Sequence, residues 1–246
     1  MKMYLRKNIS YALLALLIGC AAPQKEEEAK SVEKEEIATA PEWIVLFDGA
    51  STDGWRGFNI DTLPPNWIIE DGALKSLGEG GDLGGDIVYG AREFDNFELE
   101  LEWKISKGGN SGIFYHVVEG AQYKAPYETA PEYQLIDNLD FPQPLEDWQK
   151  VGADYAMYTA NYSENTVKPA GEWNTSRILY TAEKAAYWLN GEKMLEFVPY
   201  SDDWMERRNS GKWDQYPDYA IAKSGLIGIQ DHGSFIWFKK IRIKPL

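Results

Sequence analysis

The stretch "FELELEWKI", Phe97–Ile105, alternates apolar and acidic residues without interruption. Leu99, Leu101 and Trp103 fall on one side of an extended chain, and the glutamates between them fall on the other. Period-two alternation is typical of a β-strand with one buried face. The stretch therefore predicts a strand at the border of a hydrophobic core.

Other segments extend this pattern along the chain. "NWIIEDGALKSL" and "AAYWLNGEKMLEF" predict hairpins that turn at Asp71–Gly72 and Asn190–Gly191, because Asp-Gly and Asn-Gly are preferred two-residue turns. "WNTSRILY", "GLIGIQ" and "SFIWFKKIRI" are further short strands, and the one helix indicated in this part is Ser201–Arg208, with Ser201 as its N-cap. About ten strands without intervening helices predict an all-β fold, a two-sheet β-sandwich of jelly-roll type.

Two longer loops interrupt the strands, at residues 118–131 and 137–171. Loops of this length in a compact β domain are usually functional or disordered. These two are rich in tyrosine and proline, and their aromatic content argues against simple disorder. We expect them to fold over one end or one face of the sandwich.

The first residues, "MKMYLRKNISYALLALLIGC", combine a basic start with a short apolar run. The run is shorter than the roughly 20 residues of a membrane-spanning helix, so residues 1–19 are predicted to be a secretory signal peptide. "LIGC" resembles the lipobox of bacterial lipoproteins, which implies cleavage before Cys20 and a lipid on its thiol. Cys20 is the single cysteine of the sequence, so no disulfide is expected.

Residues 20–40 contain few apolar residues and many Glu and Lys, which predicts a flexible lipidated tether. Residues 41–246 are then the folded domain. The run "QKEEE" resembles an acidic export signal of surface lipoproteins, with a plain solvated linker as the alternative. We expect a protein that is lipid-anchored to the bacterial cell envelope at the outer membrane, on its periplasmic or its surface face.

The composition is acidic, with 25 basic and 39 acidic residues and a formal net charge of −14. Loss of residues 1–19 removes three basic residues and no acidic one, which brings the charge to about −17. Nucleic acid is excluded as a partner, because phosphate binding needs clustered Lys and Arg. The sequence has no phosphate-binding glycine loop before a helix, no HExxH and no cysteine metal site. Ten Trp and fifteen Tyr supply rings for the core and for contacts with sugars.

The first candidate functional stretch is "GGNSGIFYHV", Gly108–Val117. Strand alternation places Gly112, Phe114 and His116 on one face. His116 is a candidate base that faces a ligand, and the alternative is a histidine bonded to a neighbour in the core or at the surface.

The second stretch is "APEYQLIDN", Ala130–Asn138. Glu132 and Gln134 share one strand face, and Asp137 follows at its end, which makes a hydrogen-bonding surface suited to carbohydrate. Glu132 can serve as a general base if burial raises its pKa. The alternative is a solvent-facing strand edge.

The third stretch is "IGIQDHG", near the C-terminus. Gln230 and His232 fall on one face of a continuing strand and Asp231 on the other, with a plain strand end and turn as the alternative. A fourth candidate, the ladder Glu98, Glu100 and Glu102, resembles the acidic strand of laminarinase-type glycosidases but lacks its bulge. A solvated sheet face is the alternative for this ladder.

Six ordered blocks resemble the 3-keto-disaccharide hydrolase domain family over nearly all of residues 43–246. The blocks are "LFDGASTDGW", "FELELEWKISKGGNSGIFYHV", "APEYQLIDN", "KPAGEWNTSRILY", "YWLNGEKMLEF" and "GLIGIQDHGSFIWFKKIRI". The resemblance implies a concanavalin A-like sandwich that acts on sugars oxidised at carbon 3. The chain departs from the family at Thr175, where relatives often carry histidine.

The resemblance also implies a reaction. A ketone at C3 acidifies the proton on C2; a base removes it, the aglycone leaves C1, and water adds. His116, Glu132 and His232 are the candidate bases. The candidate sugar contacts are Asn110, Gln134, Asp137, Gln230 and Asp231. A divalent metal that polarises the ketone is possible, although no metal-ligand spacing is legible.

Three functions remain open at this point. The first is an enzyme that cleaves 3-keto-glycosides. The second is a non-catalytic carbohydrate-binding lipoprotein of lectin-like fold, because a fold does not determine a function. The third is an ordinary retaining glycosidase, which needs two carboxylates about 5–5.5 Å apart.

Overall fold

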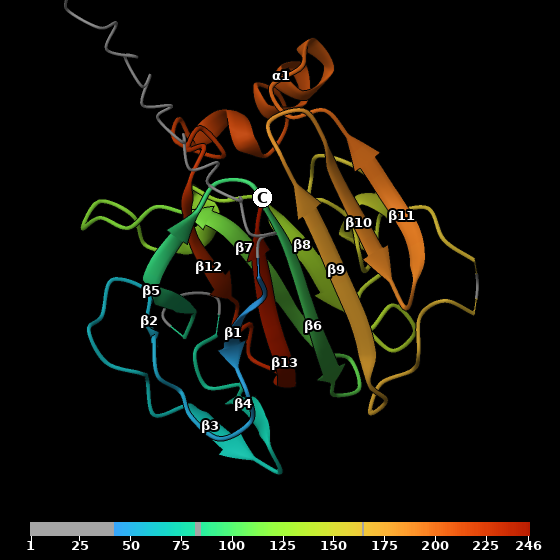
Figure 1. Cartoon of the computed structure of the whole chain (residues 1–246). Helices are drawn as coiled ribbons and strands as arrows, with labels where there is room; N and C mark the ends of the chain where they lie inside the picture. The colour runs from blue at the N-terminus through green and yellow to red at the C-terminus, as the bar shows by residue number, and fades with distance from the viewer. Residues whose placement is uncertain (1–41, 82–84, 164) are drawn as a thin grey trace, which may run out of the picture. The chain divides into compact units, whose positions relative to one another are not determined.

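The computed structural model describes residues 42–81, 85–163 and 165–246 (Figure 1). The predicted signal peptide, the tether and Cys20 lie outside the described residues. Within those three ranges, no helix is both long and apolar enough to cross a membrane.

Strands dominate the described chain: β1 (Ile44–Phe47), β2 (Trp55–Gly57), β3 (Trp67–Glu70), β4 (Ala73–Leu77), β5 (Ile87–Phe94), β6 (Phe97–Ile105), β7 (Asn110–Val117), β8 (Glu132–Ile136), β9 (Asn174–Tyr180), β10 (Ala185–Leu189), β11 (Glu192–Phe197), β12 (Gly225–Ile229) and β13 (Phe235–Pro245). The helices are α1 (Asp202–Arg208) and the 3₁₀ turns η1 (Pro126–Glu128), η2 (Asp147–Gln149) and η3 (Trp213–Gln215).

These strands form two antiparallel sheets (Figure 1). The larger sheet has the order β11-β10-β9-β6-β13-β4-β3, and β1 pairs with the C-terminal half of β13. The smaller sheet has the order β2-β5-β12-β7-β8. The predicted all-β, two-sheet sandwich of jelly-roll type is therefore confirmed.

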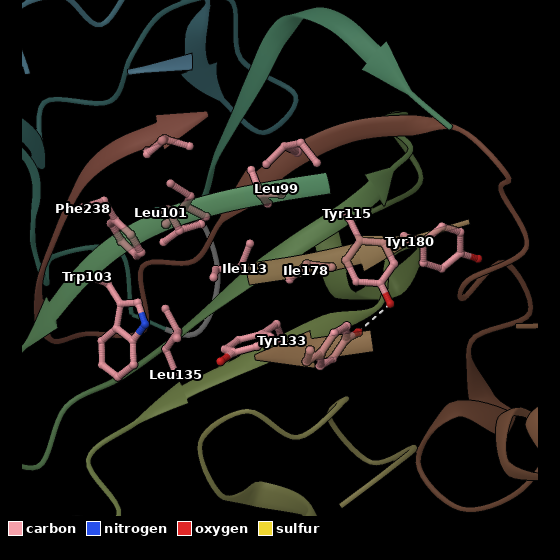
Figure 2. Close-up of a cluster of buried hydrophobic side chains, with 14 of the residues drawn as sticks. Leu99, Leu101, Trp103, Ile113, Tyr115, Tyr133, Leu135, Ile178, Tyr180 and Phe238 are labelled. Atoms are coloured by element: carbon pink, nitrogen blue, oxygen red, sulfur yellow. Dashed lines mark hydrogen bonds between the residues drawn. The ribbon is translucent and has the colours of Figure 1, made fainter. Parts of the chain in front are cut away.

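The core lies between the two sheets, as the alternation in "FELELEWKI" predicts. Leu99, Leu101 and Trp103 of β6 are buried there. Figure 2 shows them with residues of the smaller sheet, among them Tyr115 and Tyr133. Each fully buried large apolar side chain contributes roughly 1.5–3 kcal/mol relative to exposure. The buried Tyr115 hydroxyl pairs with that of Tyr187 at 2.6 Å, so this polar group is satisfied inside the core.

The acidic side of β6 faces outward and is paired with cations. Glu98 forms ion pairs with Arg177 and Lys244. Glu100 pairs with Arg242, and Glu102 pairs with the lysines at 239 and 240. The ladder is thus a set of cross-strand ion pairs on the larger sheet, which favours the alternative of a solvated sheet face over the laminarinase-like interpretation.

The local turn and cap predictions are also correct. Asp71 and Gly72 both have positive φ, at 51° and 74°, as a two-residue hairpin turn between β3 and β4 requires. Asn190 and Gly191 do the same between β10 and β11. The Ser201 side chain accepts a hydrogen bond from the Trp204 amide at the start of α1.

Candidate active site

A pocket of about 390 Å³ lies on the outer face of the smaller sheet, on β7, β8 and the end of β12. This volume is in the range typical of small-molecule sites. Its lining residues come from strands and from the loops that rise around them: Asn110, Tyr127, Glu132, Gln134, Tyr155, Lys212, Tyr216, Gln230 and His232.

The pocket is hollow because glycine occupies the middle of its floor. Gly112 on β7 lies between Gln134 on β8 and the Gln230 backbone, whose amide donates to the Gly112 carbonyl. A Cβ at Gly112 would collide with the carboxylate of Glu132. The Glu132 side chain therefore occupies the space above this glycine.

Burial sets the acid–base behaviour of Glu132, which is 4% exposed. Desolvation raises the pKa of its carboxyl group to about 8, the Lys212 ammonium opposes this rise, and the Asp86 charge adds to it. The main-chain amide of Tyr155 donates to the Glu132 carbonyl and ties the strand to the loop above it. Glu132 is thus a positioned carboxyl group that changes protonation near neutral pH.

Lys212 is the cation that faces this acid. Burial lowers the pKa of its ammonium group, and the Glu132 charge opposes that shift. Its Nζ lies 4.2 Å from the ring centroid of Tyr155, 4.7 Å from that of Trp213 and 5.5 Å from that of Tyr127. These cation–π contacts hold the ammonium at the pocket wall.

Aromatic residues from three loops form the walls. Tyr127 and Tyr155 belong to the two long loops that the sequence predicted to cover the sandwich. The rings of Tyr127 and Tyr216 meet edge to face at 5.7 Å. Trp213 donates its indole N–H to the Tyr155 carbonyl and stacks on Tyr219 at 3.8 Å. The loop that carries Trp213 and Tyr216 is therefore packed rigidly against the loop that carries Tyr155.

Neutral polar groups complete the lining. Gln134 donates to the Asn110 side-chain oxygen at 3.3 Å. Gln230 is anchored through its carbonyl, which accepts from the Ser111 hydroxyl at 2.7 Å, while its buried Oε1 has no hydrogen-bond partner among the described residues. His232 is half-buried at the rim. The structure thus brings five predicted site residues together: Asn110, Glu132, Gln134, Gln230 and His232.

His116 is not among them, and the face predicted for it is wrong. Between Phe114 and Val117, β7 has one residue more than β12, which is a β-bulge, and His116 has a φ of 58°. The bulge packs the imidazole between the sheets, against the rings of Tyr115 and Tyr180. Its Nε2 donates to the Asp95 carbonyl at 2.8 Å, and burial lowers its pKa to about 4. The structure favours the alternative of a bonded core histidine.

Asp137 and Asp231 also lie outside the pocket lining, because backbone amides bind them. Asp137 accepts from the amides of Gly108, Leu139 and residue 140. Asp231 accepts from the Asn66 side chain at 2.6 Å and from the amides of residues 80 and 233 at 3.0 Å each. Both aspartates organise loops and do not line this pocket, so their role as sugar contacts stays a prediction. Thr175, the departure from the family, is exposed on the larger sheet.

Sequence reasoning missed four lining residues, Tyr127, Tyr155, Lys212 and Tyr216. The pattern that indicated the first two loops is present again in "SGKWDQYPDY", residues 210–219, which is aromatic and contains proline.

In the described ranges no group of three or more His, Cys, Asp or Glu residues is arranged to hold a metal ion. The groups that converge on the pocket are therefore an acid, an amine, amides, phenols and an imidazole.

Solved structures of related proteins define the class of this molecule. A "putative glycosyl hydrolase" from Parabacteroides distasonis is 44% identical, with a TM-score of 0.77 over 83% of this chain and 94% of that one. A second from the same species is 26% identical, with a TM-score of 0.62 over 83% of this chain and 100% of that one. The molecule is therefore an enzyme of the glycosyl hydrolase type, and its pocket is lined by the buried acid Glu132 and the half-buried amine Lys212.

The family is more specific than the class. The model of the 3-keto-alpha-glucoside-1,2-lyase-like domain matches residues 42–244. The chain is also 37% identical over 233 residues to the 3-keto-disaccharide hydrolase of Bacteroides thetaiotaomicron, which covers 83% of this chain and 78% of that protein. The chain belongs to this 3-keto-glucoside lyase-like family, which confirms the resemblance seen in the sequence.

Proposed function

We propose that this protein cleaves glycosides whose sugar carries a ketone at C3, such as 3-keto-disaccharides, with Glu132 as the general base. The observation that carries the proposal is the Glu132 carboxyl group, buried above Gly112 and facing Lys212. Membership of the family supplies the substrate class.

The chemistry requires a base near neutral pH. The C3 ketone stabilises the carbanion at C2 as an enolate, so a carboxylate can take the C2 proton. The electron pair of the enolate then forms the C1–C2 double bond, and the C1–O bond breaks with its electrons on the leaving oxygen. Water adds to C1 and a proton returns to C2, which completes a net hydrolysis. Burial supports this role, because it brings the pKa of Glu132 close to the working pH.

Lys212 is suited to stabilise the negative charge that develops on the keto oxygen. An ammonium group in a partly desolvated site interacts more strongly with an oxyanion than it does in water. The contacts with Tyr155 and Trp213 place the charge before substrate arrives, so little reorganisation is needed during reaction. The amides of Gln134 and Gln230 and the imidazole of His232 offer hydrogen bonds to sugar hydroxyls.

The decisive experiment compares 3-keto-trehalose with plain trehalose. The purified protein should release sugar from the keto substrate only, because without the ketone the C2 proton is not acidic enough for a carboxylate. Equal cleavage of both sugars would indicate an ordinary glycosidase. Binding of the keto sugar without turnover would indicate the carbohydrate-binding alternative.

We also propose that residues 1–19 are removed and that Cys20 carries the lipid that anchors the enzyme to the outer membrane. The support is the lipobox-like "LIGC" after a short apolar run. Cys20→Ser should leave an unprocessed precursor that takes up no labelled fatty acid, and normal labelling of this variant would reject the proposal.

A further inference from the structure

A second buried carboxyl group, which the mechanism above does not use, lies next to the pocket, under the strand end that carries Gln230. Asp86 immediately precedes β5 and is 7% exposed. Ile229 of β12 pairs with Ile87 of β5 in antiparallel register, so the next position pairs Gln230 with Asp86. Ile87 belongs to the core between the sheets and Val88 to the cluster on the outer face. By alternation, Asp86 lies on the pocket side of the sheet, beside Gln230.

Asp86 is also close enough to the pocket to act on its charges. Its carboxylate raises the pKa of Glu132 and that of Tyr127, and both residues line the pocket. The strand order places β12 between β5 and β7. Asp86 and Gly112 are thus two strands apart, about 10 Å between backbones at the usual strand spacing. Since Glu132 lies over Gly112, the two carboxyl groups lie on the same face of the sheet, with β12 between them.

The surroundings of Asp86 keep it protonated at a useful pH. Burial raises the pKa of its carboxyl group to about 7, the hydrogen bond from the Asp231 amide to Oδ1 at 2.9 Å opposes this, and the Asp231 charge adds to it. That amide engages Oδ1, so the proton of the neutral carboxyl group resides on Oδ2. A carboxyl group of this kind is a proton donor matched to neutral conditions.

We propose that Asp86 is the general acid that protonates the leaving oxygen at C1 while Glu132 removes the proton from C2. This inference rests on the proposed function. As the C1–O bond breaks, its electron pair takes the Asp86 proton and the aglycone departs as a neutral alcohol. The Asp86 carboxylate then takes a proton from the water that adds to C1, and Glu132 returns its proton to C2. Both groups regain their initial state, so the cycle balances.

The test uses substrates that differ in the leaving group alone. Asp86→Asn should lower kcat/KM for methyl 3-keto-glucoside by about 10²–10⁴-fold, because methoxide is a poor leaving group without a proton. With 4-nitrophenyl 3-keto-glucoside, whose phenolate leaves unaided, the loss should be less than about tenfold. As a control, Glu132→Gln should lose similar factors on both substrates, because both need the C2 proton removed.

Each outcome decides the inference. The ratio of the two rates is measured on one preparation, so partial unfolding of the variant cancels. Equal losses on both substrates would reduce Asp86 to a structural partner of Asp231, and no loss on either would remove it from the reaction. Inactivity of the unaltered protein on both substrates would refute the proposed function and the inference together, whereas normal activity with a leaving-group-independent effect refutes the acid alone.

Discussion

Replacement of Glu132 by glutamine tests the proposed reaction most directly. The amide has the size and shape of the carboxyl group, so it fits the space above Gly112, but it cannot take a proton. Loss of a general base costs about 10²–10⁴-fold in rate, which corresponds to about 2.7–5.4 kcal/mol of barrier. We expect kcat/KM on a 3-keto-glycoside to fall by this factor in Glu132→Gln.

The pH profile adds a signature that a packing defect would not produce. The base works only when it is deprotonated, and burial raises the pKa of Glu132 to about 8. On 4-nitrophenyl 3-keto-glucoside, whose leaving group needs no proton from Asp86, the kcat/KM of the unaltered enzyme should therefore rise with pH up to about 8, whereas an ordinary glutamate would be deprotonated above about 4.3. The residual activity of Glu132→Gln should lack this limb.

Stability gives an independent check. A carboxyl group whose folded pKa lies above its unfolded value binds more protons when folded, so its contribution to stability falls as pH rises between the two values. Glutamine does not titrate, and Glu132→Gln should gain stability relative to the parent from about pH 5 to pH 8. Glu100→Gln, on the outer face of the other sheet, is the control and should change neither rate nor profile. Wild-type kcat/KM with an unchanged profile in Glu132→Gln would refute the assignment.

Three further predictions concern Lys212 and His232 in the pocket and His116 in the core. Lys212→Met removes the charge that lowers the pKa of Glu132, so the rising limb should move to higher pH while kcat/KM drops by about 10²–10³-fold; a move to lower pH would contradict the pairing. His232→Ala should reduce kcat/KM on a 3-keto-glycoside by roughly two- to tenfold, as expected for one lost hydrogen bond to the sugar, with little change in melting temperature, and a purified variant with normal activity would remove His232 from the site. For His116, whose buried ring has a pKa of about 4, stability should decline as pH falls from about 6.5 to about 4, by about 3 kcal/mol; urea unfolding of His116→Gln should show a flatter acid limb with unchanged rate per folded molecule.

Local patterns in the sequence determined the fold class and much of the floor of the site. The alternation in β6, the Asp71–Gly72 and Asn190–Gly191 turns and the Ser201 cap depend on neighbours along the chain, and all of them are found in the structure. The same alternation placed Glu132 and Gln134 on one face of β8, where both reach the pocket.

Tertiary structure decided which candidates meet. Strand alternation alone places His116 on the outer face of β7. The β-bulge, one extra residue of β7 relative to β12, directs its side chain into the core instead. Asp231 is drawn to Asn66 and Gly80, which lie far away in sequence.

The walls of the pocket also depend on contacts between residues far apart in the sequence. Lys212 comes from a loop that Trp213 fixes against Tyr155. The Asp86 carboxylate accepts from the Asp231 amide only because β5 and β12 are neighbours. Strand periodicity is a property of adjacent residues and can be read from sequence. A bulge, a loop contact or the order of strands depends on how distant segments pack together. That packing is determined by burial and hydrogen bonding in the folded chain.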